Sequence, residues 1–160
     1  MAQRLTRFLF ILLAAALVST PPAVAQSDDI RIAVSKSSFE DVKFELNNAI
    51  VNRGLVIDYT GRLGDMLART GKDVGSEKQI YRHAEYVTFC SAKLSRAMME
   101  ADPANIAMCP YVIFFYEAAA KPGEVVVGYR RPVLRGNEKS KAALKEVDAL
   151  LAAILKEAGK

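Results

Sequence analysis

The chain has 160 residues, of which 51% are hydrophobic, so it can bury a core large enough to exclude intrinsic disorder. Its formal net charge of +4 comes from 22 Lys and Arg against 18 Asp and Glu, and it falls to +2 without Arg4 and Arg7 near the start. Because Arg130, Arg131 and Arg135 are the only local basic concentration, the composition argues against a nucleic-acid partner.

Residues 1–25 have the pattern of a cleavable signal peptide. A positively charged start precedes an unbroken apolar run at residues 8–18, and Ala23-Val24-Ala25 matches a small-x-small cleavage site. As a helix this run would span about 16 Å, well short of the roughly 30 Å hydrocarbon core, so we expect no permanent membrane anchor. The sequence therefore predicts a periplasmic or secreted protein with one domain over residues 26–160.

The first half of this domain is predicted to begin with a strand and a helix. Residues 30–35 alternate apolar and small or polar side chains, as in a strand that buries the face carrying Ile30, Ile32 and Val34. A helix is expected over residues 39–53, with Ser37 and Glu40 at capping-box spacing. A strand at 55–59, a short helix at 61–70 and a polar loop at 71–76 follow.

The second half is predicted to contain three more strands and two helices. Residues 79–90 are rich in β-branched and aromatic side chains, and residues 111–117 give the clearest strand signal of the chain. Further elements are a helix at 91–101, a hairpin partner strand at 125–130 and a closing helix that runs to residue 158. The predicted fold is an α+β two-layer sandwich, with a mainly antiparallel sheet and helices packed on one face.

Cys90 and Cys109 are the only two cysteines, and 18 residues separate them. In an oxidising compartment such a pair predicts a disulfide, which would stabilise the fold by about 3 kcal/mol in the chain-entropy model for a loop of about 20 residues. Two alternatives stay open, a thiol-redox pair and a soft-metal site for copper or haem. The spacing does not match the two intervening residues of a thioredoxin-like dithiol.

Other chemistry has weaker support in the sequence. Met108 would add a thioether to the two thiolates, a ligand set that binds Cu(I), and His83 is the only histidine. His83 could otherwise act as an axial haem ligand or as the base of a hydrolase, but no Gly-x-Ser-x-Gly motif supplies a nucleophile. We therefore expect no catalytic residue and no cofactor, with Cys90, Cys109, Met108 and His83 as the alternative metal set.

The hairpin strands are apolar on both faces. Tyr111, Ile113 and Phe115 point to one side of their strand, and alternate residues point to the other side. The two long helices can cover only one side, so the other side predicts either a homodimer interface or a site for an apolar ligand. The candidate residues are Tyr111 and Tyr116 as polar handles, Phe114, and Gly128, which would allow close approach.

Several of these features together resemble the domain of unknown function 302 family. They include Ser38-Phe39 at the start of the first helix, a helix that ends at Asp102-Pro103, and Pro110 before the strand at 111–117. The resemblance covers most of the mature chain and implies a compact α+β fold with an antiparallel sheet and no established activity. One branch of the family is similar in having a cysteine at the position of Cys90 and a second one near Cys109, on the other side of the proline, which implies that the two cysteines are close in space.

The leading functional hypothesis is a non-catalytic exported module that binds an unknown small apolar ligand or a protein partner. The alternative is a thiol-redox or soft-metal periplasmic protein that uses Cys90 and Cys109. A hydrolase with His83 as its base is a third and weaker hypothesis.

Overall fold

The computed structural model describes residues 29–160, so the predicted signal peptide lies outside the described residues. The elements follow one another in the order β1 (Ile30–Ser35), α1 (Phe39–Val51), β2 (Val56–Gly61), α2 (Leu63–Thr70), η1 (Lys72–Val74), β3 (Tyr81–Cys90), α3 (Ala92–Ala101), η2 (Pro103–Met108), β4 (Tyr111–Ala118), β5 (Val125–Arg130) and α4 (Glu138–Ala158). The two η segments are 3-10 turns. Within residues 29–160, none of the helices has both the length and the apolar character needed to cross a membrane.

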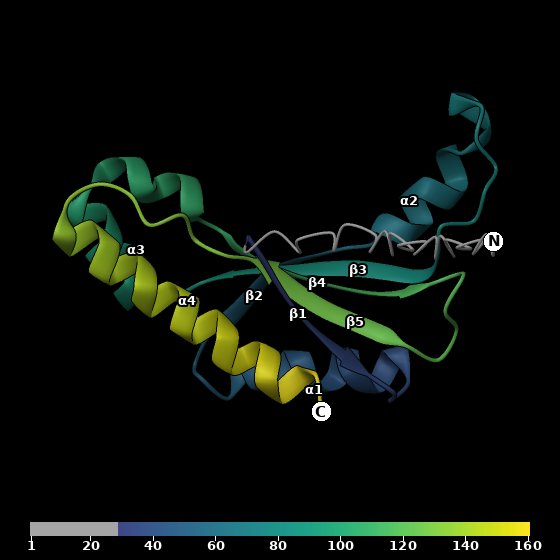
Figure 1. The fold of residues 1–160 in the computed structure, drawn as a ribbon, viewed down its shortest axis with the longest axis horizontal. Coiled ribbons are helices and arrows are strands. Elements are labelled where there is room, and N and C mark those ends of the chain that lie inside the picture. The colour runs from purple at the N-terminus through teal and green to yellow at the C-terminus, as the bar shows by residue number, and fades with distance from the viewer. Residues whose placement is uncertain (1–28) are drawn as a thin grey trace, which may run out of the picture.

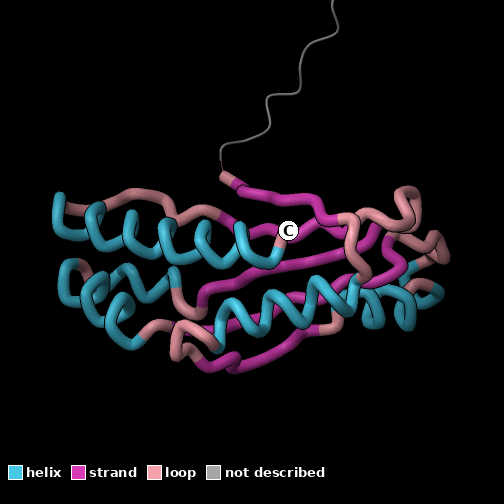
Figure 2. The backbone as a smooth tube through the Cα atoms, turned by 90° about the horizontal axis from the view of Figure 1, so that it is seen from below, coloured by secondary structure: helices cyan, strands magenta, loops and turns pink. Residues whose placement is uncertain are grey.

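The strands form one five-stranded antiparallel sheet in the order β1-β5-β4-β3-β2. Figure 1 shows α1 and α4 on the same side of this sheet, and Figure 2 shows both helices in front of the strands. The predicted α+β class is therefore confirmed. The hairpin of β4 and β5 also forms in the predicted place, with Phe114 opposite Gly128.

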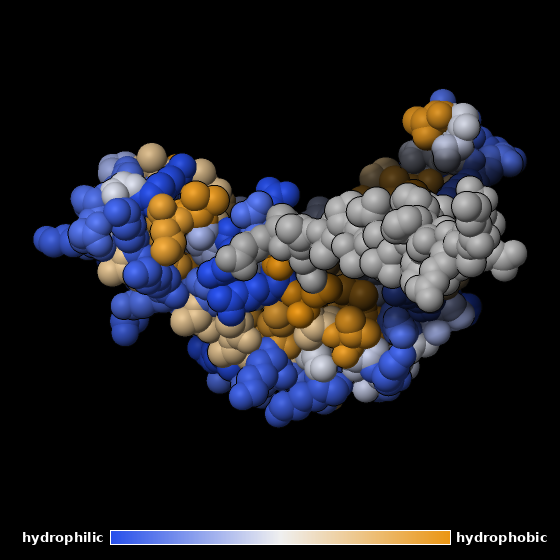
Figure 3. All heavy atoms as spheres, viewed as in Figure 1, coloured by the Kyte–Doolittle hydropathy of each residue, from blue (hydrophilic) through white to orange (hydrophobic). Residues whose placement is uncertain are grey.

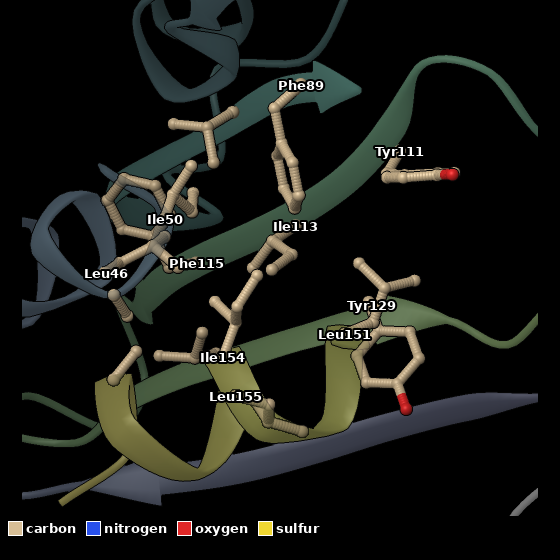
Figure 4. Close-up of a cluster of buried hydrophobic side chains, with 14 of the residues drawn as sticks. Leu46, Ile50, Phe89, Tyr111, Ile113, Phe115, Tyr129, Leu151, Ile154 and Leu155 are labelled. Atoms are coloured by element: carbon tan, nitrogen blue, oxygen red, sulfur yellow. The ribbon is translucent and has the colours of Figure 1, made fainter. Parts of the chain in front are cut away.

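The core lies between the sheet and its two long helices. Side chains from α1, α4 and the three central strands point toward one another in this layer (Figure 4). Leu46, Phe89, Ile113, Phe115 and Ile154 are each completely buried there. The buried residues recur at helical spacing within α1 and α4 and at every second position within β4, as expected for elements that each turn one face to the core.

The helix starts differ in one detail from the prediction. Ser38, and not Ser37, is the N-cap of α1, because its hydroxyl oxygen accepts a hydrogen bond from the backbone N–H of Asp41 at 3.1 Å. The Ser38 hydroxyl also donates to the Asp41 carboxylate at 2.6 Å. Asn137 caps α4 in the same manner through the backbone N–H of Ser140. Each cap satisfies a backbone donor that the helix itself leaves without a partner.

Strand β1 presents the opposite face from the one predicted. Ile30, Ile32 and Val34 are 42%, 42% and 50% exposed. The residues between them face α4 instead: Ala33 packs against the core, and the Arg31 guanidinium donates to the Asp148 carboxylate at 3.2 Å. The prediction that the aliphatic side chains of β1 are buried is therefore wrong, since α4 covers the face with the small and polar residues.

A buried amide fixes the η2 segment to the rest of the fold. The Asn105 side chain is completely buried, and its Nδ2 donates to the backbone carbonyl of Met98 and to the Ser140 hydroxyl, both at 2.8 Å. These two bonds join η2 to α3 and to the first turn of α4. They hold in place the segment that carries Cys109 at its end.

Candidate functional site

The two cysteines meet at one end of the sheet. Cys90 is the last residue of β3, and Cys109 follows η2 just before β4. Antiparallel pairing places Phe89 opposite Tyr111, so the 18 residues between the cysteines leave the sheet as α3 and η2 and return beside their starting point. Both cysteines are half-buried and both are free thiols, so the predicted disulfide is not formed in this structure.

The two thiols, which we call the thiol pair, interact directly. The pKa of the Cys90 thiol is raised to about 11, first by burial, then by hydrogen bonding to the Cys109 side chain and by the negative charges of Cys109 and Asp58. A hydrogen bond from the backbone of Tyr111 acts in the opposite direction. Cys90 therefore holds its proton at neutral pH.

Two hydroxyl groups extend the thiol pair. The Cys109 Sγ lies 3.2 Å from the Ser95 Oγ of α3, and the same oxygen lies 3.3 Å from the Tyr111 hydroxyl. Burial raises the pKa of Tyr111, partly offset by its hydrogen bond to Ser95. Sequence reasoning missed Ser95, because a serine inside a predicted helix carries no signal that it will contact a distant cysteine.

The alternative metal set does not come together. His83 lies seven residues before Cys90 on the same strand, about 23 Å away at the rise of a β-strand, and its ring stacks on Phe39 at 4.9 Å. Met108 is partly buried against the core beside Cys109. No group of three or more His, Cys, Asp or Glu side chains that could hold a metal ion occurs within residues 29–160.

The surroundings of His83 do not complete a hydrolase site either. His83 borders a shallow hollow of about 490 Å³ together with Ser38 and Glu117. The Ser38 hydroxyl donates to the Asp41 carboxylate and caps α1. Within residues 29–160, Ser38 and His83 form no hydrogen bond with each other. Ser38 is thus a structural cap rather than an activated nucleophile.

The second candidate is the side of the sheet away from α1 and α4, which we call the open face. Its paired positions carry mainly apolar and aromatic side chains, and several are well exposed, among them Val112 at 42% and Tyr59 at 59%. Figure 3 shows hydrophobic side chains gathered over β1 and β5, with hydrophilic ones at either side. By the strand registers, the open face consists of Ile30, Ile32, Val34, Val56, Tyr59, Gly61, Tyr81, Ala84, Tyr86, Thr88, Cys90, Val112, Phe114, Tyr116, Ala118, Val126, Gly128 and Arg130.

Helices border the open face but leave its centre uncovered. Figure 1 shows α2 and η2 at opposite ends of the sheet, on the side away from α1. Helix α2 covers Ala84, which is only 7% exposed, because Gly64 brings the helix backbone close to it. The apolar residues of β1, β4 and β5 on this face lie beyond its reach.

Two glycines let aromatic rings lie flat on the open face. A Cβ at Gly128 would stand 2.6 Å from Cζ of Phe114, and one at Gly61 would stand 2.2 Å from Cζ of Tyr86. The close approach that we expected at Gly128 from a ligand is thus made by the protein's own Phe114. The Phe114 ring lies over β5 and the Tyr86 ring lies over β2, so the two rings point away from each other and fill the space that the glycines leave.

The predicted face residues divide between the two sides of the sheet. Phe114, Tyr116 and Gly128 lie together on the open face, where the Phe114 and Tyr116 rings stack at 6.2 Å. Tyr111 is 3% exposed and lies on the core side, with its ring 5.8 Å from that of Phe89. Tyr111 therefore belongs to the surroundings of the thiol pair.

Comparisons with known proteins identify the fold and the family. The family described as "Domain of unknown function DUF302" matches residues 30–158. A crystal structure of an uncharacterized conserved DUF302 protein from Bacillus stearothermophilus is similar with a TM-score of 0.68 and 11% identity, over 82% of this chain and 99% of that chain. None of the curated proteins compared with the chain matches it. Since the matching region spans every strand and helix of the described chain, the protein belongs to the DUF302 family.

Proposed function

We propose that the protein is an exported, non-catalytic binding module, that the open face is its binding surface, and that a second copy of the chain occupies it. The single observation that carries the proposal is the exposed apolar sheet surface over β1, β4 and β5, which no helix within residues 29–160 covers. Contiguous apolar surface of this kind on a protein outside membranes usually marks an interaction site.

The shape of the open face favours a flat partner over a small molecule. Phe114 and Tyr86 lie over Gly128 and Gly61, so their rings fill the space above the neighbouring strands, whereas small-molecule sites are concave and surround most of the ligand. Two sheets can instead pack face to face at about 10 Å with their side chains interdigitated. A flat sheet face therefore fits another sheet face.

The size and charge of the open face suit a symmetric dimer. Five strands spaced about 4.8 Å apart and about 20 Å long give a face of roughly 500 Å², so two copies would bury about 1,000 Å² or more, which is the lower bound of a specific interface. Among the paired strand positions of the open face within residues 29–160, Arg130 at the end of β5 is the only charged residue. Pairing two copies therefore brings no like charges together at its centre.

Light scattering and sedimentation on the purified protein test this proposal. We expect a dimer that Val112→Asp and Val34→Asp convert to a folded monomer, because both side chains are exposed on the open face. Phe44→Asp is the matched control, since Phe44 is 63% exposed on α1, on the far side of the sheet. If the protein is a monomer that releases an organic molecule on denaturation, the open face binds a ligand and not a second copy. If it is a monomer without a ligand, the open face is not a binding surface.

The export part of the proposal rests on the sequence of residues 1–25. A positive start, a short apolar run and Ala23-Val24-Ala25 support cleavage after Ala25. We expect the intact mass of the protein from its native host to correspond to a chain that begins at Gln26. A mass that includes residues 1–25 would contradict export by cleavage and would remove the reason to expect an oxidising compartment.

The contact between Cys90 and Cys109 favours a second candidate function, that of a dithiol protein that is reversibly oxidised. The two thiols are neighbours although 18 residues separate them, and the resemblance to a cysteine-bearing branch of the family is consistent with such a pair. A count of free thiols before and after mild oxidation tests it, together with metal analysis of the same sample. Loss of both thiols without bound metal supports oxidation, whereas bound copper with both thiols reduced supports soft-metal binding.

A further inference from the structure

Two groups that can donate a hydrogen bond, the Cys90 thiol and the Ser95 hydroxyl, lie against the Cys109 sulfur. Cys90 contacts it from β3 and holds its proton at neutral pH. The Ser95 hydroxyl contacts it from α3 at 3.2 Å. Tyr111 also stays protonated, and its hydroxyl lies 3.3 Å from the Ser95 oxygen. When Tyr111 donates to Ser95, the Ser95 hydrogen is free to point at Cys109.

This arrangement makes the two cysteines unequal. A negative charge on the Cys109 sulfur has two donors, the Cys90 thiol and the Ser95 hydroxyl. A negative charge on Cys90 would instead be partly buried, near Asp58 and opposite the second thiol. Because the thiolate is the nucleophilic form, the sulfur with donors is the one suited to attack.

We propose that Cys109 is the thiol that attacks a disulfide co-substrate and that Cys90 is the thiol that resolves the mixed disulfide. Ser95 is a positioning residue that orients the Cys109 sulfur and stabilises its charge. The assignment rests on the second candidate function, the reversibly oxidised dithiol.

The reaction is two successive thiol–disulfide exchanges with a low-molecular-weight disulfide, RSSR. Cys109, as its thiolate, attacks one sulfur of RSSR, which forms the Cys109–SR bond and releases RS⁻. Cys90 then loses its proton and attacks Sγ of Cys109, which forms the Cys90–Cys109 disulfide and releases the second RS⁻. The protein is oxidised by two electrons, RSSR is reduced to two RSH, and the two cysteine protons end on the two leaving thiolates.

Single-cysteine variants separate the two roles. The reduced protein is treated with glutathione disulfide, and the mixed disulfide is followed by intact mass. Cys90→Ser keeps a hydroxyl donor beside Cys109, so we expect it to accumulate the glutathione adduct at least about tenfold faster than Cys109→Ser near neutral pH. Wild type is expected to pass to the internal disulfide with little adduct.

Ser95→Ala in the Cys90→Ser background tests the positioning role. We expect the rate of adduct formation to fall about threefold or more and the midpoint of its pH profile to move upward, because Cys109 loses a donor. Ser91→Ala is the matched control: its hydroxyl caps the same helix through the backbone N–H of Leu94, so the variant loosens α3 without removing the Ser95 hydroxyl. That control should leave the pH midpoint unchanged.

The outcomes distinguish failure of the assignment from failure of the dithiol function. If wild type forms the internal disulfide but Cys109→Ser reacts as fast as Cys90→Ser or faster, the assigned order is wrong while the dithiol function stands. If wild type forms no internal disulfide with glutathione disulfide, the dithiol function fails with it. An equal shift of the pH midpoint in Ser91→Ala and Ser95→Ala would overturn the role of the Ser95 hydroxyl.

Discussion

The ring of Phe114 lies over Gly128 of the neighbouring strand, at a distance that leaves no room for a side chain on the glycine. A Cβ there would stand 2.6 Å from Phe114 Cζ, 2.7 Å from the backbone oxygen of Arg31 and 2.9 Å from Cγ2 of Ile32. Strands β1, β5 and β4 therefore meet around this glycine, and the flatness of the open face depends on it.

We expect Gly128→Ala to lower the free energy of unfolding by about 1–3 kcal/mol, since the Arg31 oxygen belongs to the backbone and cannot turn away. Gly61→Ala is the matched comparison, because the three atoms nearest to its added Cβ all belong to the outer end of the Tyr86 ring. That ring can move, so Gly61→Ala should lower the free energy of unfolding by less than Gly128→Ala does. When Tyr86→Ala is already present, Gly61→Ala should have little further effect. Equal costs in urea denaturation of the two glycine variants would contradict this account.

Asn105→Ala is expected to be among the most destabilising single changes outside the apolar core. It removes two hydrogen bonds and leaves the Met98 carbonyl and the Ser140 hydroxyl buried without this partner, at a cost of about 2–4 kcal/mol. Asn52→Ala, at an exposed position after α1, is the control and should cost less than about 1 kcal/mol. Chemical denaturation of both variants checks the difference, and similar values would mean that the buried amide does not anchor η2.

The order and type of the elements could be predicted because local signals agree with the final packing. Asp102-Pro103 ends α3 where the proline removes a helix donor, and the apolar stripe of residues 144–158 lies on the buried side of α4. Alternation in β1 likewise gave the strand and its two faces. It could not show which face is covered, because that depends on α4, which joins the sheet more than a hundred residues later.

The sequence predicted only those residues of the candidate site that stand out by their type or by their alternation along a strand. The two cysteines stand out by their number, and the apolar alternation of β4 gave Phe114 and Tyr116 a common face. Ser95 carries no such signal, since a serine inside a helix is common and its role comes from the packing of α3 beside Cys109. Parity placed Tyr111 and Tyr116 on opposite sides of β4, but that Tyr111 lies on the covered side and contacts Ser95 could be found only from the fold.

The raised pKa of Cys90 predicts a loss of stability at alkaline pH in the reduced protein. The thiol titrates near 9.0 when unfolded and near 11 when folded. Between these values the unfolded state has lost the proton and the folded state retains it, so the free energy of unfolding falls as pH rises and levels off above about 11. Below the unfolded pKa this contribution to stability is fully present.

Urea denaturation across this range, in the presence of a reductant, measures the effect against Cys90→Ser. As pH rises from the unfolded to the folded pKa of Cys90, the free energy of unfolding of wild type should fall relative to that of the variant. Tyr111 and Tyr129, whose pKa values are also raised, titrate in both proteins and largely cancel. A difference that stays constant with pH would mean that Cys90 is not held as a buried thiol against Cys109.

Oxidation of the thiol pair should stabilise the fold. Closing a loop of about 20 residues restricts the unfolded chain by about 3 kcal/mol in the chain-entropy model, from which any strain in the folded state is subtracted. The strain is expected to be small because the pairing of Phe89 with Tyr111 already holds the two cysteines together, and the sulfur atoms need only close to bonding distance. We therefore expect the free energy of unfolding of the oxidised protein to be about 2–4 kcal/mol higher than that of the reduced protein. Urea denaturation with and without reductant measures this difference. The double variant Cys90→Ser with Cys109→Ser is the control and should have the same free energy of unfolding with and without reductant. If the oxidised wild type is no more stable than the reduced protein, the strain that the disulfide causes at the ends of β3 and β4 cancels the stabilisation gained by restricting the unfolded chain.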